Sequence, residues 1–200
     1  MLIVRRALQL VQRAVTSADL KRSASTVLCG ITVYHATDRF SPASMYSAVH
    51  TALLFLEAHD SRRLKAARRY LRCIVVAAQP HTVYWRHSRA CALSDVQLSR
   101  QPPAWIASGI VHESVHARLH SLGFAPSDVD QRRRQESVCV AEEIRFLAKV
   151  PHSEAIIAHL RAELESGDWY GDSARRRQTV GRLIALNAPE WLIRWFERRV

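Results

Sequence analysis

The chain has 200 residues, of which 48% are hydrophobic and 24% are charged, and its formal net charge at pH 7 is +11. This length and apolar content predict one domain with a substantial core and exclude a wholly disordered chain. The positive charge favours an acidic or anionic partner, such as nucleic acid, an anionic membrane surface or an acidic substrate, although a solvated basic surface accounts for it equally well.

The first twenty residues carry arginines and apolar residues at helical spacing and predict an amphipathic helix. This segment has no acidic residue before Asp19 and lacks the apolar stretch and small-residue cleavage site of a secretory signal. Read as an ordinary first helix, it implies a cytoplasmic protein. The alternative is a helix that targets an organelle or lies on a membrane surface. The sequence contains no apolar run long enough to span a bilayer.

The next segments predict a β-rich stretch at 25–35 and two helices, at about 43–58 and 62–71. Ser41-Pro42 opens the first helix, and Asp60 and Ser61 cap the second. The exposed face of the second helix is the densest basic patch of the chain, formed by Arg62, Arg63, Lys65, Arg68, Arg69 and Arg72.

This basic patch offers a contact for an anionic partner through four of its arginines, Arg62, Arg63, Arg68 and Arg69, although a solvated helix face is the simpler interpretation. No aromatic-rich strand motif or zinc finger accompanies the patch. We therefore expect no sequence-specific binding of nucleic acid.

Three short runs, 73–78, 82–86 and 90–94, are typical of strands, with a turn at His87-Ser88-Arg89. They predict a small antiparallel sheet of two or three strands.

Helices are predicted over most of the remaining chain. One runs from Pro103 to residue 122 and is ended by Gly123, and the next covers about 128–149, with Ser127 as its cap and Pro151 as its stop. Further helices are expected at 152–166, 173–186 and 189–199. The fold class is therefore α+β and mainly helical, as a single domain with an N-terminal region (1–60), a core (61–150) and C-terminal helices (151–200).

The helix at 103–122 contains the sequence His112-Glu113-Ser114-Val115-His116. Two histidines four residues apart project from one face of a helix, at a separation that suits two nitrogen ligands of one zinc ion. Glu113 is rotated from the first histidine, so it can reach a water on the metal and act as general base without binding the metal itself. The alternative is a helix with two surface histidines, but the adjoining apolar face predicts that this helix packs into the core.

A zinc site also needs a third protein ligand, and Glu136 on the next helix is the candidate. A turn at 123–127 folds that helix back antiparallel, so Glu136 can face the histidines. Glu143 shares its face and is expected to accept a hydrogen bond from a ligand histidine, whereas Glu142 points away. The alternative for Glu136 is a solvated carboxylate beside the run of three arginines at 132–134.

The His-Glu-x-x-His motif followed by Glu136 on a later helix resembles the gluzincin branch of zinc metallopeptidases. The stretch 70–150 also looks like a group of small, uncharacterised bacterial proteins that combine a Val-His-Glu-x-x-His-Ala-Arg-Leu helix with a Glu-x-x-Cys helix. This resemblance implies a zincin-like fold, a Zn²⁺ cofactor and hydrolysis of a peptide or protein substrate. The chain departs from well-known gluzincins at Gln135 and Val140, where an asparagine and an acidic residue are common.

Other residues have weaker patterns. His120 is too far along the helix axis from His112 to share its metal. Substrate contact in zincins commonly involves the edge of a small sheet, which here implies 82–94, and Tyr84, His81 or His87 could donate to an oxyanion. The four cysteines form no C-x-x-C pair, and we expect reduced thiols, with Cys91 and Cys139 as core residues.

Two functions follow from the sequence. The first is a zinc metallopeptidase in which His112, His116 and Glu136 bind the metal and Glu113 is the general base. The second is a non-catalytic, metal-containing protein that binds an anionic partner through its basic surface. The aromatic segment from Trp191 to Phe196 could touch a membrane or a partner, although packing onto the domain is the simpler interpretation.

Overall fold

The computed structural model describes residues 23–166 and the single positions 180, 190, 191 and 194. The helix predicted at 1–20 lies outside the described residues, as do the helices predicted at 173–186 and 189–199 apart from those four positions. In the described part of the chain, no helix has both the length and the apolar character needed to cross a lipid bilayer.

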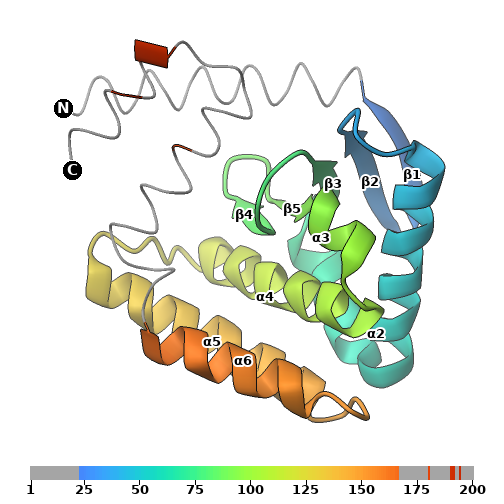
Figure 1. Ribbon diagram of the computed structural model, residues 1–200. Coiled ribbons are helices and arrows are strands. Elements are labelled where there is room, and N and C mark those ends of the chain that lie inside the picture. The colour runs from blue at the N-terminus through green and yellow to red at the C-terminus, as the bar shows by residue number, and fades with distance from the viewer. Residues whose placement is uncertain (1–22, 167–179, 181–189, 192–193, 195–200) are drawn as a thin grey trace.

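The described chain is mainly helical and contains one small sheet, as the α+β prediction requires (Figure 1). Its strands are β1 (Ala24–Leu28), β2 (Ile31–Ala36), β3 (Cys73–Ala77), β4 (Val83–Trp85) and β5 (Ala90–Ser94). Its helices are α2 (Pro42–Tyr70), α3 (Asp95–Arg100), α4 (Pro103–Ser121), α5 (Val129–Leu147) and α6 (Glu154–Ser166).

The sheet is mixed, so the prediction of an antiparallel sheet is wrong. Its strand order is β1-β2-β3-β5-β4, and β3 runs parallel to both β2 and β5, whereas the outer pairs are antiparallel. The reason is the length of α2, which returns the chain to the starting end of the sheet, so that β3 enters in the direction of β2. Short runs separated by turn residues suggest hairpins, and only β1–β2 and β4–β5 have that form.

A tight turn divides the predicted β-rich stretch into β1 and β2. Cys29 and Gly30 both have positive φ angles, 47° and 76°, and Leu28 pairs with Ile31. Two residues of positive φ match the right-handed twist of the flanking strands, and glycine adopts such angles without steric cost. This hairpin places β2 beside the central strand β3.

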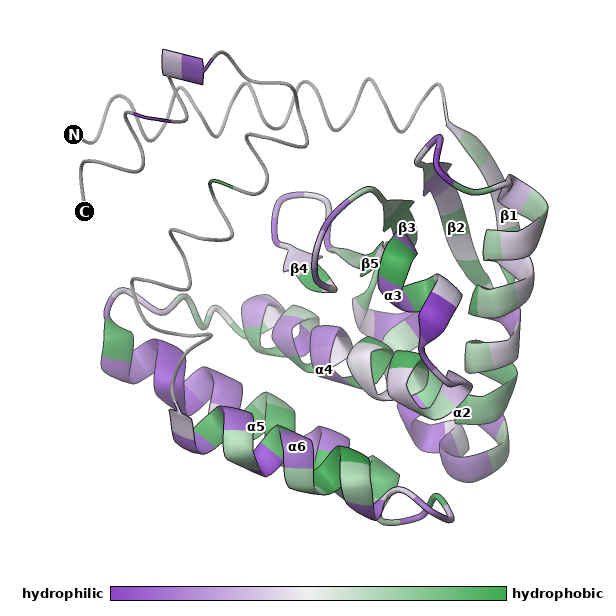
Figure 2. Ribbon diagram, in the orientation of Figure 1, coloured by the Kyte–Doolittle hydropathy of each residue, from purple (hydrophilic) through white to green (hydrophobic). Residues whose placement is uncertain are grey.

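Helix α4 lies between the sheet and the pair α5–α6 (Figure 1). It packs on α2 along one side and on α5 along another, and the core between these elements contains fully buried Leu53, Leu56, Ile110 and Phe146. The central strand β3 is apolar along its length, whereas the first turns of α5 are hydrophilic (Figure 2). Helix α4, which contains the His-Glu-x-x-His motif, is therefore one of the most enclosed elements of the fold.

The kink in α2 and the turn between α4 and α5 follow from local sequence. Asp60 has non-helical angles inside α2 and accepts a hydrogen bond from the backbone N–H of Arg63, so it caps the second half of a kinked helix. At the end of α4, Gly123 has φ +84°, and Gly123 and Phe124 donate to the carbonyls of His120 and Leu119. These two bonds form a Schellman motif, which ends the helix and turns the chain back.

The cap of α5 is Asp128, one residue later than the predicted Ser127. The Asp128 carboxylate accepts from the backbone N–H of Gln131 at 2.8 Å. Aspartate competes well with serine at this position because its charge also interacts favourably with the positive end of the helix dipole.

Candidate metal centre

Four potential metal ligands from α4 and α5 meet in the interior. One donor atom from each of His112, His116, Glu136 and Cys139 lies within 4.8 Å of the others. The helices contribute two donors each, at i and i+4 on α4 and at i and i+3 on α5, and these spacings place both residues of a pair on one helix face. The antiparallel turn at Gly123 brings the two faces together. This group could hold a metal ion.

The three predicted ligands have the separations of a tetrahedral site. Nε2 of His112 lies 3.0 Å from Nε2 of His116 and 3.1 Å from Oε2 of Glu136, and His116 Nε2 lies 3.4 Å from the same oxygen. A tetrahedral ion with bonds of about 2.0–2.1 Å separates its ligands by about 3.3–3.4 Å. The donors therefore need to move by only a few tenths of an ångström to accept such an ion.

Glu143 holds the ring of His112 from the other side, as the helix pattern predicts. Its Oε2 lies 2.9 Å from Nδ1 of His112, and the Glu143 side chain is buried. If Nδ1 donates to this carboxylate, Nε2 is left with its lone pair directed at the other donors. Such a carboxylate fixes the ring orientation of a ligand histidine and raises its basicity.

Glu113 is next to this group and has no polar partner for one of its oxygens. The residue is 5% exposed, and its Oε2 is buried without a hydrogen bond. Burial raises the pKa of Glu113, and the neighbouring imidazoles only partly oppose this. A buried carboxylate oxygen without a partner is costly in an ordinary core. This oxygen is available to accept a hydrogen bond from a polar molecule that enters the site.

The electrostatics of the group show how strongly its members interact. Burial acts to lower the pKa of His116, but Cys139 and the Glu136 carboxylate outweigh it and raise that pKa to about 10. Burial likewise acts to raise the pKa of Glu136, but the two imidazoles hold it far below its usual range.

Tyr84, on the edge strand β4, lies beside the donor group. Its ring stacks on the ring of His116 with centroids 6.3 Å apart and an interplanar angle of 7°. Its hydroxyl forms a 3.0 Å hydrogen bond with Nδ1 of His120. His120 therefore contacts the rim of the site and is no member of the donor group, as its axial distance predicts. His81 and His87, the other oxyanion candidates, are exposed on the loops that flank β4.

The chain matches no known family model, no curated protein and no solved structure.

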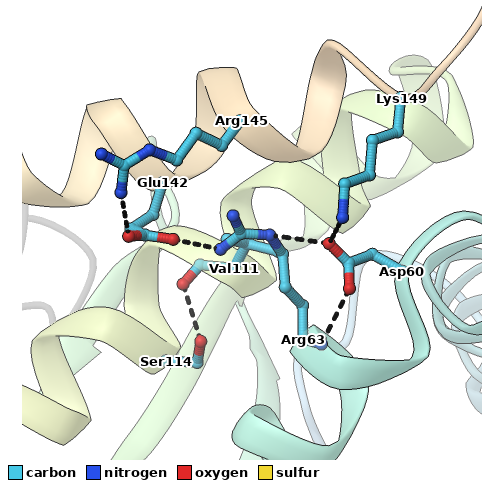
Figure 3. Close-up of polar contacts among 7 residues, drawn as sticks. All are labelled: Asp60, Arg63, Val111, Ser114, Glu142, Arg145 and Lys149. Carbon is cyan, nitrogen blue, oxygen red and sulfur yellow. Dashed lines mark hydrogen bonds and ion pairs between the residues drawn. The ribbon is translucent and has the colours of Figure 1, made fainter.

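A network of ion pairs ties α5 to α2 (Figure 3). Arg63 bridges the Asp60 and Glu142 carboxylates, Lys149 contacts Asp60 at 2.7 Å, and Arg145 contacts Glu142 at 2.6 Å. Glu142 points into this network and away from the donor group, as its position on the helix predicts. Because Asp60 stands at the kink of α2, the network joins α5 to α2 at the kink.

The same network reduces the number of arginines that are available on the basic patch in the second half of α2. Arg63 is held between two carboxylates and its side chain is only 17% exposed. Arg68 donates to the backbone carbonyl of Cys29 and lies 3.7 Å from Glu57. Arg62 and Arg69 remain exposed, the latter beside the Tyr70 ring. An anionic partner on this face would thus meet fewer available arginines than the sequence indicates.

Cys139 is the member of the group that the sequence interpretation placed in the core. The thiol is fully buried, as expected, but its sulfur faces the donor group. The available signal was its position three residues after Glu136, which puts the two on one face of α5.

Proposed function

We propose that this protein is a zinc-dependent hydrolase, and specifically a metallopeptidase. The observation that carries the proposal is the convergence of His112, His116 and Glu136 beside the buried, unpartnered oxygen of Glu113. Three protein ligands together with a carboxylate that does not bind the metal are the residue set that hydrolytic zinc chemistry requires.

Zinc is the metal that fits this donor set best. Imidazole donors suit zinc and other late first-row ions, whereas magnesium and calcium prefer sites built only from oxygen. The ligand separations of 3.0, 3.1 and 3.4 Å favour tetrahedral coordination, which is the usual geometry of protein zinc sites. When bound, zinc would lower the pKa of a coordinated water towards neutrality and polarise the substrate carbonyl.

Glu113 is the proposed general base and then general acid. It follows His112 directly on α4, so the helix rotates its side chain away from the face of the two histidines. The carboxylate therefore lies beside the donors without being one of them. Its raised pKa, caused by burial, brings it closer to neutrality, where a carboxylate both accepts and returns a proton effectively. It would take a proton from the attacking water and deliver it to the leaving amine.

The edge strand β4 is the proposed contact for the peptide backbone. It pairs with β5 along one side, and among the described residues nothing pairs with its other side. An extended peptide can add to such an edge through backbone hydrogen bonds. Tyr84 lies on this strand beside His116, so its hydroxyl is the proposed donor to the oxyanion that forms at the cleaved carbonyl.

The decisive experiment is purification of the full-length protein with its metal, followed by incubation with a complex peptide mixture. We expect one zinc per chain, peptide cleavage detected by mass spectrometry, loss of cleavage on chelation and its recovery on addition of zinc. A protein that contains no zinc and gains none on dialysis against zinc would contradict the metal centre. One zinc per chain with no cleavage of any peptide would contradict the hydrolase.

The second candidate is a non-catalytic metal protein that binds an anionic partner. One observation favours it, namely the exposed pair Arg62 and Arg69 on a strongly basic chain. Binding of this kind weakens steeply with salt, because counterions are released from the partner. Tight, salt-dependent binding of an anionic polymer that Arg62→Ala and Arg69→Ala abolish together, in a protein without peptidase activity, would favour this candidate.

A further inference from the structure

The sulfur of Cys139 completes a set of four donor atoms around one point. Sγ lies within 4.8 Å of the ligand atoms of His112, His116 and Glu136, and the residue is fully buried. Cys139 follows Glu136 by three residues, so the same turns of α5 that place the carboxylate also direct the thiol at the histidines. Sulfur stands on the α5 side of the group, and the imidazoles stand on the α4 side.

The surroundings of Cys139 differ from those of the other buried cysteines. Cys73 and Cys91 pack within apolar clusters of the sheet and its flanking helices, and Cys139 belongs to neither cluster. Its neighbours in the donor group are two imidazoles and a carboxylate. A thiol that only fills space is expected among hydrocarbon side chains, because it behaves as a small hydrophobe. The thiol of Cys139 instead lies beside three other groups that can bind a metal.

We infer that Cys139 is the fourth ligand of the metal and that the resting centre is held by two imidazoles, a carboxylate and a thiolate. This inference rests on the metal centre of the proposed function and extends it by one ligand. Binding breaks the S–H bond, the proton leaves to solvent, and the sulfur lone pair is donated to the metal.

Four protein ligands give the resting centre the closed form that zinc sites with structural roles adopt, whereas a hydrolytic site keeps one position for water. The two forms are compatible in one protein if the thiolate leaves, or if the coordination expands, when substrate binds. With the thiolate bound, the resting centre is then expected to cleave peptides more slowly than a centre that lacks Cys139 and is held by three protein ligands.

X-ray absorption at the zinc edge of the full-length, zinc-loaded protein tests the inference directly. We expect one sulfur neighbour at about 2.3 Å together with nitrogen and oxygen neighbours at about 2.0–2.2 Å. Cys139→Ala is expected to lose the sulfur neighbour, and its zinc affinity should fall by more than the roughly 10–100-fold that loss of an outer partner costs. Cys73→Ala removes a buried thiol outside the donor group and is expected to keep both.

The outcomes separate this inference from the proposed function. One bound zinc with only nitrogen and oxygen neighbours overturns the fourth ligand and leaves the hydrolase in place. A sulfur neighbour that survives Cys139→Ala also overturns it. A protein that binds no zinc overturns the metal centre itself. The wild-type spectrum needs no variant to fold, and Cys139→Ser offers a smaller change if the alanine variant is unstable.

Discussion

Oε2 of Glu136 lies 3.1 Å from Nε2 of His112, although 24 residues and a complete reversal of the chain separate the two side chains. This contact joins the two halves of the donor group, because each helix alone provides only two donors. The turn at Gly123 reverses the chain, the packing of α5 on α4 brings the two faces together, and the ion pairs of Arg63 join α5 to α2. Predictions about the metal centre therefore concern both the donors and the elements that bring them together.

Replacement of Glu136 by glutamine is expected to remove most of the zinc. The amide keeps the size of the side chain but carries no charge and binds zinc poorly. The affinity for zinc should therefore fall by more than the roughly 10–100-fold that follows loss of a residue that only hydrogen-bonds to a ligand. Zinc content after dialysis against a weak chelator measures the effect. Glu142→Gln is the matched control on the same helix, since Glu142 contacts Arg63 and Arg145 instead of the histidines. Equal zinc retention by both variants would remove Glu136 from the ligand set.

Glu113→Gln is expected to separate catalysis from metal binding. The amide retains the shape of the side chain but cannot accept a proton, so zinc content should stay at the wild-type level while kcat falls by about 10²–10⁴-fold. Kinetic assays on a cleaved peptide and metal analysis of the same sample provide both readouts. If the variant cleaves that peptide as fast as the wild type, Glu113 is not the general base.

Tyr84→Phe is expected to impair the chemical step more than substrate binding. The ring and its stacking on His116 are preserved, but the hydroxyl that could donate to an oxyanion is lost, so kcat should fall by about 10²-fold with a small change in KM. Tyr34→Phe on β2 is the control, because β3 and β5 separate β2 from β4 in the sheet. Unchanged kcat in Tyr84→Phe would assign the tyrosine a packing role only.

The stabilisation of the protein by zinc is expected to grow as the pH rises from about 6 to about 8. In the metal-free protein the pKa of His116 is raised to about 10, above its unfolded value of about 6.5. Its contribution to stability is therefore complete below pH ~6.5 and is lost as the pH rises towards 10. Zinc displaces protons from the same donors, so its binding strengthens over that range.

Thermal unfolding with zinc and with a chelator, measured at several pH values, gives this stabilisation as a difference in Tm. A difference that shrinks as the pH rises would contradict competition between zinc and protons for one site.

Asp60→Asn is expected to lower the free energy of unfolding of the metal-free protein by about 1–3 kcal/mol. The carboxylate accepts from Arg63 and Lys149, and its side chain is only 5% exposed. Glu57→Gln removes an exposed partner of Arg68 and should change stability by less than about 0.5 kcal/mol. Urea unfolding in the presence of a chelator measures both variants.

The effect of Asp60→Asn should also depend on pH. Burial acts to raise the pKa of Asp60, but Lys149 and Arg63 outweigh it and lower the pKa below its usual value. The contribution of this carboxylate is therefore present above its unfolded pKa of about 3.9 and is lost as the pH falls through the folded pKa. Urea curves of variant and wild type should approach each other in acid. A gap that widens at low pH would show that the ion pairs are not its source.

The sequence by itself predicted the long helices, most of the strands and three of the four donors. Helical periodicity, Pro103 and Gly123 predicted α4, and its pattern placed His112 and His116 on one face, because a helix defines the relation of residues four positions apart without help from the rest of the chain. The same local rule separated Glu136 and Glu143 from Glu142 on α5. Asp60 as a helix cap and the hairpin of β4 and β5 also follow from residues close together in the sequence.

The tertiary structure alone decided the relations between elements. Whether β3 runs parallel or antiparallel to its neighbours depends on where α2 returns the chain, and no periodicity within the strands records this. The stacking of Tyr84 on His116 depends on β4 reaching α4 at one particular height. Cys139 was assigned to the core because burial is the commonest fate of a cysteine. Its position in the donor group required the packing of α5 on α4, which directs one buried face at another.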